Sequence, residues 1–178
     1  METSQHFWRQ AGEYIKPGNL VAELYHGEKD DILKGLAEIV KEGGMVYGAD
    51  HLNPFDKHQN MRDLQSIPNI KLLKTDIPQL PQELKNLDAV VIRELVWAGS
   101  LPFGDENPET YAAIDSALKT GGHLILHLNQ TEQKSEMSPL ISQRIYQNTL
   151  KRQLPHFQKV YHCEDLMAYQ KTAQDAPK

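Results

Sequence analysis

The sequence has 178 residues, of which 39% are hydrophobic, and a formal net charge of −5. This length is enough to bury one core and too short for two catalytic domains, so we expect one domain. The longest purely apolar runs, at residues 89–92 and 124–126, are only a few residues long, well short of the roughly 20 that a membrane span needs. The negative charge offers no general attraction to phosphate backbones, so nucleic acid is not indicated as a partner.

The chain contains a single cysteine, Cys163. It therefore forms no intrachain disulfide, and its stability must come from packing, as in proteins of the reducing cytosol. The first ten residues carry Glu2, His6 and Arg9 and lack the apolar core of a secretory signal. These features predict a cytoplasmic protein.

Positive charge is concentrated in one segment, residues 140–160, which contains four cations and no acid. Most such runs are solvated helix faces. The segment is still the strongest candidate for a basic surface, through Arg144, Lys151, Arg152 and Lys159.

Strand and helix patterns alternate through the first half of the chain. Short apolar runs predict strands at residues 19–25, 45–49 and 70–74. Residues 30–41 have apolar side chains at helical spacing, and Gly43 with Gly44 ends that helix. A weaker helix is predicted at residues 54–65, where Asn53 precedes a proline.

The second half continues the alternation and ends in a hairpin. Residues 87–94 (LDAVVIRE) contain an uninterrupted apolar run, which predicts the most central strand because both of its faces must be covered. Helices are predicted at residues 107–119 and 138–154, each with a proline near its start, with a fifth strand between them at 123–128. Two strand-like runs, 157–163 and 166–171, are separated by hairpin spacing.

Repeated strand-helix-strand units require right-handed crossovers and therefore a parallel sheet, to which the hairpin adds an antiparallel edge. We predict an α/β fold with a single doubly wound, mainly parallel seven-stranded sheet and an antiparallel C-terminal hairpin. The domain should cover residues 16–172, after a helical N-terminal extension at 1–15 and before a frayed tail at 173–178.

Ligands bind such a sheet beyond the carboxyl ends of its strands. The first predicted strand carries Glu23 near its end, the second is followed by Asp50, the third by Asp76, and the fourth leads into Arg93. Because these ends meet at one edge of a parallel sheet, the four residues are candidates for a single site.

The strand ends belong to a longer pattern. Residues 16–24 (KPGNLVAEL), 45–50 (MVYGAD), 74–81 (KTDIPQLP) and 117–124 (ALKTGGHL) follow one another in the order and spacing of class I S-adenosylmethionine-dependent methyltransferases, and residues 16–171 together resemble that family. The resemblance implies a methyltransferase-like Rossmann fold and S-adenosylmethionine as the cofactor. It also implies transfer of a methyl group to an acceptor that the sequence does not identify.

The resemblance implies roles for individual residues. Asp50 would bind the ribose hydroxyls, since a carboxylate accepts two hydrogen bonds from a vicinal diol. Asp76 would accept a hydrogen bond from the adenine amine. The alternative for each acid is an exposed cap of the following helix. The candidate cofactor-binding residues are Glu23, Tyr25, Gly27, Asp50, His51, Asp76, Ile77 and Arg93.

The loop after the first strand departs from the family pattern of acid-x-Gly-x-Gly-x-Gly. Residues 23–29 read ELYHGEK, and only Gly27 is retained. Glycines are needed there because the backbone turns tightly and the cofactor lies against the main chain. If Tyr25 and Lys29 fill that space, the wild-type protein should bind the cofactor weakly or not at all.

The sequence indicates no catalytic residue. Residues 92–97 (IRELVW) lack the Asn-Pro-Pro-aromatic motif of amino methyltransferases, which disfavours methylation of nucleic-acid amines. His123 and His127 share one face of the fifth strand, about 13 Å apart, and are too far from each other to bind one metal. No metal site is predicted.

Three functions remain open at this stage. The first is a methyltransferase that acts on a small-molecule or protein acceptor, either as a monomer or as a homo-oligomer. The second is a non-catalytic module of the same fold that binds a protein partner. The third and weakest is a nicotinamide-nucleotide binder, which the missing Gly-x-Gly-x-x-Gly disfavours.

Overall fold

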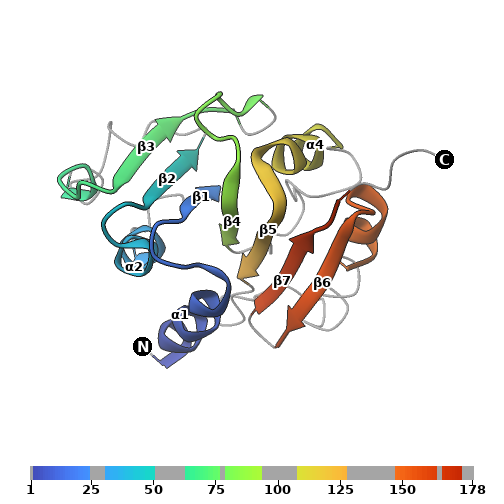
Figure 1. Ribbon diagram of the computed structural model, residues 1–178, viewed down its shortest axis with the longest axis horizontal. Helices are drawn as coiled ribbons and strands as arrows, with labels where there is room; N and C mark the ends of the chain where they lie inside the picture. Colours follow the sequence, from blue (N-terminus) through green and yellow to red (C-terminus); the bar gives the residue numbers. More distant parts are fainter. Residues whose placement is uncertain are drawn as a thin grey trace, which may run out of the picture.

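A seven-stranded sheet runs through the computed structural model, which describes residues 2–24, 31–50, 63–76, 79–93, 108–127, 147–163 and 166–173. The strand order is β3-β2-β1-β4-β5-β7-β6, so β4 is central, as the sequence predicts (Figure 1). The strands are β1 (Leu20–Leu24), β2 (Met45–Asp50), β3 (Ile70–Lys74), β4 (Leu87–Arg93), β5 (Leu118–His127), β6 (Phe157–His162) and β7 (Leu166–Lys171).

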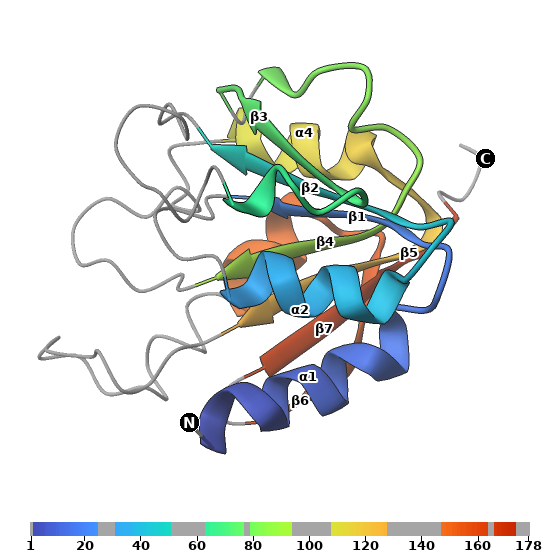
Figure 2. The ribbon, with the colours of Figure 1, turned by 90° about the vertical axis from the view of Figure 1, so that its left-hand side faces the viewer.

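The strand directions confirm the predicted fold class. Strands β1 to β5 are mutually parallel where they pair, and β7 is antiparallel to both β5 and β6. In Figure 2 the arrowheads of β1, β2 and β4 point to the same side of the molecule. We call this side the carboxyl edge of the sheet and the opposite side the amino edge.

The described helices are α1 (Glu2–Tyr14), α2 (Asp31–Val40) and α4 (Pro108–Ala117), and residues 147–153 are also helical. Helix α2 carries its apolar residues at helical spacing, as predicted. The negative charge of Asp31 in its first turn interacts favourably with the positive end of the helix dipole. Among the described residues, no helix is long and apolar enough to cross a membrane.

The helices divide the core into one cluster on each face of the sheet. Helices α1 and α2 cover one face, where Phe7, Leu33 and Leu36 pack against Val91 and other strand residues. Helix α4 and the 147–153 helix cover the other face (Figures 1 and 2), and their apolar residues belong to the second cluster. Because side chains alternate along a strand, every other residue of the central strands belongs to the α1/α2 face.

The start of β5 differs from the prediction. The sequence suggested a helix to residue 119 and a strand from 123, but α4 ends at Ala117 and β5 begins at Leu118. Leu118 pairs with Leu87 of β4, after which the register shifts. Gly121 has φ +83, and a Cβ on Gly122 would lie 2.9 Å from the carbonyl oxygen of Lys119. These glycines therefore carry the strand through an irregular turn instead of separating it from the helix.

Two buried or half-buried acids hold the amino edge together. Asp88 pairs with Lys119 of β5 and accepts a hydrogen bond of 2.8 Å from the backbone N–H of Leu20, so one carboxylate joins β4, β5 and β1. Asp115 of α4 accepts hydrogen bonds from Nε2 of His156 (2.7 Å) and Nζ of Lys171 (2.9 Å).

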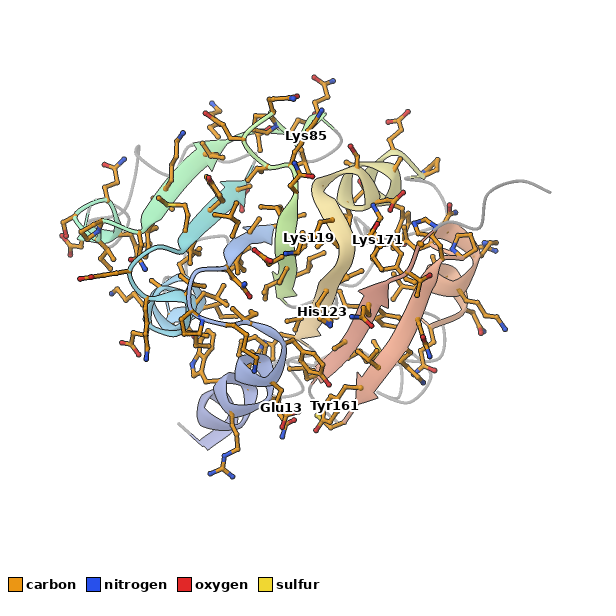
Figure 3. The ribbon with its side chains drawn as sticks, viewed as in Figure 1. Glu13, Lys85, Lys119, His123, Tyr161 and Lys171 are labelled. Atoms are coloured by element: carbon orange, nitrogen blue, oxygen red, sulfur yellow. The ribbon has the colours of Figure 1, made fainter. Side chains whose placement is uncertain are left out.

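Lys171 also donates to the carbonyl oxygens of Asp115 (2.6 Å) and Leu118 (2.8 Å) and so caps the carboxyl end of α4. Figure 3 shows Lys171 between α4 and the hairpin. The hairpin is thus fastened to the end of α4 that lies away from the carboxyl edge.

Candidate functional site

The sheet register places a row of polar residues at the carboxyl edge. Strand β1 ends at Leu24, which pairs with Ala49 on β2 and Ile92 on β4. The residues that follow Ala49 and Ile92 are polar, and so are their register partners on the next strands, β3 and β5. We call these four residues the edge row: Lys74 on β3, Asp50 on β2, Arg93 on β4 and His127 on β5.

Two members of the edge row can be assigned to a face of the sheet. Val46 and Ile125 belong to the core cluster beneath α1 and α2. Asp50 and His127 follow them at even spacing and therefore lie on that same face. The edge row thus presents a carboxylate on β2 and an imidazole on β5 to the same side of the sheet.

Glu23 lies two positions before the edge row, on β1. It is fully buried, and its register partners are Gly48 on β2 and Val91 on β4. Val21, two residues earlier, belongs to the α1/α2 cluster, so Glu23 points to the same face as Asp50. A buried carboxylate is costly to desolvate. Its place near the strand end is therefore a feature that a function would explain.

Asp50 is buried as well, with 2% of its surface exposed. The side chain is therefore not exposed, and whether it caps a following helix stays untested because residues 51–62 lie outside the described part of the chain. Its backbone carbonyl accepts a 2.8 Å hydrogen bond from the N–H of Thr75, which fixes the end of β3 beside the end of β2. Asp76, the next residue, is exposed. The predicted placement of Asp50 and Asp76 at one edge of the sheet is confirmed.

A short turn orients Asp76. Its carbonyl oxygen accepts a 2.8 Å hydrogen bond from the N–H of Gln79. The hydroxyl of Thr75 donates to the carbonyl oxygens of Asp76 (3.3 Å) and Gln79 (3.2 Å). The turn therefore fixes the backbone of Asp76, an exposed acid that follows β3, the strand paired with the end of β2.

Several predicted site residues lie outside the described part of the chain. These are Tyr25, Gly27, His51 and Ile77, together with Lys29 of the same loop. Arg93 is described through its backbone, which places it in the edge row between β1 and β5. The roles of all these residues stay predictions.

His127, the member of the edge row on β5, was not among the predicted site residues. The sequence suggested for it only metal binding together with His123, at a distance too long for one metal. In the structure, His127 packs on Phe7 of α1 with ring centroids 4.5 Å apart, and His123 packs on Tyr14 of the same helix at 5.1 Å. Burial lowers the pKa of His123. In the structure His127 ends β5, whereas the predicted strand continued to residue 128.

The carboxylates of this edge can bind hydroxyl and amine groups, since each accepts charge-assisted hydrogen bonds. Asp50 and Asp76 end adjacent strands, and β4, which follows β1 in the sheet, is where the strand order reverses. A ligand crevice is expected there in an open α/β sheet. The antiparallel β7, inserted between β5 and β6, completes the pattern. The chain has the fold of S-adenosylmethionine-dependent methyltransferases.

Solved structures support this statement. An O-methyltransferase from Thermotoga maritima superposes with a TM-score of 0.66 and 15% identity, over 97% of this chain and 67% of the other. A methyltransferase from Aquifex aeolicus gives 0.61 and 14%, over 90% and 86% of the two chains. An N-methyltransferase from Bradyrhizobium japonicum gives 0.63 and 11%, over 97% and 98%.

Sequence comparison gives no further assignment. No family model matches the chain, and no curated protein matches it significantly. At 11–15% identity the structural similarity shows the fold alone.

Proposed function

We propose that this protein is an S-adenosylmethionine-dependent methyltransferase whose cofactor binds at the carboxyl edge over β3, β2 and β1. The observation that carries the proposal is the pair of carboxylates at the ends of β2 and β3. Asp50 is buried in the edge row, and Asp76 is exposed in a hydrogen-bonded turn after β3, the strand that pairs with β2. This arrangement fits a ligand with a diol and an amine next to each other.

The residues fit the cofactor in the order that the strands impose. Asp76, just after β3, would accept a hydrogen bond from the adenine amine, Asp50 on β2 from the ribose hydroxyls, and Glu23 on β1 would lie below the methionine end. The cofactor supplies an electrophilic methyl group on a sulfonium. The protein's contribution is then mainly to hold an acceptor in line with that group, so few catalytic side chains are needed.

The acceptor in this proposal is a small molecule or a protein of the cytoplasm. The formal net charge of −5 and the absence of the Asn-Pro-Pro-aromatic motif speak against nucleic acid. The single cysteine is consistent with a reducing compartment.

Calorimetry with S-adenosylmethionine and S-adenosylhomocysteine tests the proposal directly. We expect binding of both by the wild type. Asp50→Ala should weaken binding by about 1.5 to 3 kcal/mol, at least about tenfold, because hydrogen bonds to a charged group are lost. Glu42→Ala is the matched control, since Glu42 is an exposed acid in the turn that precedes β2 at the amino edge. Equal affinity of a folded Asp50→Ala protein and the wild type would show that the ribose is not held there.

Cofactor binding next to the loop of residues 23–29 distinguishes the two hypotheses, an enzyme and a non-catalytic module of the same fold. Tight binding by the wild type means that this loop takes another path around the cofactor, as an enzyme requires. If instead Tyr25 and Lys29 fill the methionine end, the double variant Tyr25→Gly, Lys29→Gly should create or strengthen binding that the wild type lacks. It should lose some stability through added freedom of the unfolded chain.

A further inference from the structure

Helix α1 lies along β5 from one edge of the sheet to the other. Phe7, in its first half, packs on His127 at the end of β5, with ring centroids 4.5 Å apart. Tyr14, its last residue, packs on His123, four residues earlier on the strand, at 5.1 Å. Figure 2 shows the start of α1 on the side to which β1, β2 and β4 point. The helix therefore reaches from the amino edge to the edge row.

Helix α1 is held by the packing of its side chains. Phe7, Ala11 and Ile15 are at most 1% exposed and belong to the core cluster under α1 and α2. The indole of Trp8 lies where a Cβ on Gly35 of α2 would be only 2.5 Å away. Within the described part of the chain, no hydrogen bond or ion pair joins a described side chain of α1 to a strand or to another helix. The docking of α1 therefore depends on how well its rings fit the rings beneath them.

His123 is the ionisable ring under the last turn of α1. It is partly buried, and its register partners, Ala89 on β4 and Gln170 on β7, carry no charge. Tyr14 covers it from α1 with the ring planes tilted by 49°, and the Tyr14 ring also lies 6.3 Å from that of Tyr161 on β6. Three rings from α1, β5 and β6 thus meet at one place.

The titratable groups around these rings leave loss of water as the main influence on the imidazole. Glu13 of α1 lies near both tyrosines but is exposed, so water screens its charge (Figure 3). A hydrogen bond with Cys163 raises the pKa of Tyr161. Burial raises the pKa of Tyr14 and lowers the pKa of His123. The docked helix therefore favours the neutral form of the imidazole.

We propose that His123 links the docking of α1 to pH: α1 stays docked on the neutral imidazole and is loosened when that ring takes up a proton. A charged ring needs water that the docked Tyr14 ring excludes, and release of α1 restores that water. The inference does not rest on the function proposed above. It affects the same edge of the sheet, however, because a released α1 takes Phe7 away from the end of β5.

The direction of the pH dependence follows from where each state takes up its proton. Released, His123 takes it up near its ordinary pKa of about 6.5, and docked it does so at a lower pH. The docked state is therefore fully favoured above about pH 6.5 and loses its advantage as the pH falls below that value. One proton changes the ratio of released to docked α1 by at most about tenfold for each pH unit.

Amide hydrogen exchange measured by mass spectrometry tests this link in the intact protein. Exchange of α1 and of the central strand β4 is compared at pH 7.5 and pH 5.5, after correction for the intrinsic effect of pH on exchange. In the wild type, the protection of α1 should fall by about two- to tenfold at pH 5.5, while that of β4 stays the same. His123→Gln carries a neutral side chain at both pH values, so its α1 should be equally protected at both.

Two variants control for the other histidines at this helix. His127→Gln removes the ring under Phe7, and His6→Gln removes the histidine of α1 itself. Each should keep the pH dependence of the wild type. The inference is overturned if α1 of the wild type is equally protected at both pH values, if β4 loses protection to the same extent, if His123→Gln behaves as the wild type does, or if either control removes the effect.

A second measurement does not require His123→Gln to fold. NMR titration gives the pKa of His123 in the wild type and in Tyr14→Ala, which removes the ring that covers the imidazole. The pKa should be higher in Tyr14→Ala than in the wild type, because the imidazole regains water. An equal pKa in the two proteins would overturn the inference. So would a higher pKa in the wild type, since the Tyr14 ring would then attract the imidazolium through a cation–π interaction.

Discussion

Tyr169 of β7 gives a prediction with a worked magnitude. The residue is 6% exposed and lies in the core cluster under α4. Burial raises the pKa of its phenol from 10.0 to about 12. The folded protein therefore keeps this proton longer than the unfolded chain does. The resulting stability is complete below pH 10 and is lost as the pH rises toward 12.

At pH 11 the phenol is mostly ionised in the unfolded chain and mostly protonated in the folded protein. Because this pH lies about one unit above the unfolded pKa, the free energy of unfolding falls by about 1.4 kcal/mol. Residual contact with water reduces this to the order of 1 kcal/mol. Between pH 8 and pH 11 the wild type should lose about that much more free energy of unfolding than Tyr169→Phe. Urea unfolding followed by circular dichroism at the two pH values measures both quantities.

A second variant identifies the cause. The Tyr169 hydroxyl donates to Sδ of Met167 at 3.8 Å, a weak hydrogen bond. Met167→Leu removes this acceptor and keeps the phenol buried, so it should lose stability with pH as the wild type does. Equal losses in the wild type and Tyr169→Phe would refute the argument from burial.

Two further predictions concern the helices. Burial alone would raise the pKa of Asp115, but hydrogen bonds from His156 and Lys171 outweigh it and hold the pKa below its ordinary value. Asp115→Asn should therefore lower the free energy of unfolding by about 1 to 3 kcal/mol at pH 7. In urea unfolding this difference should shrink as the pH falls through the pKa of the folded protein, and a constant difference would contradict it. In α2, a Cβ on Gly35 would lie 2.5 Å from the indole of Trp8. Gly35→Val should lower the melting temperature through a loss of about 1 to 3 kcal/mol, and Trp8→Ala should relieve most of that loss; additive effects would show that the ring is not the obstacle.

Most of the fold could be predicted because its signals are local. Short apolar runs predicted β1 to β4, and the two residues between the runs 157–163 and 166–171 predicted the hairpin of β6 and β7. The start of β5 was wrong because Gly121 and Gly122 read as a helix stop. Their actual conformation depends on pairing with Leu87, a contact between residues distant in the sequence.

The candidate site was predictable in part for the same reason. Asp50 and Asp76 directly follow recognisable strands, so their common edge follows from the parallel order. The burial of Asp50 does not, because it depends on how β1, β3 and the α1/α2 face enclose the end of β2. His127 was not selected because its relation to Asp50 appears only when the register is counted across four strands.

The contacts of α1 have a consequence for how the chain folds during synthesis. Phe7 meets His127 and Tyr14 meets His123, so this first helix docks on a strand more than 100 residues later in the sequence. Such non-local contacts form slowly, and synthesis is vectorial. The ribosome must therefore release β5 before α1 can bury Phe7. Until then the nascent chain exposes an amphipathic helix, which is the kind of segment that chaperones bind.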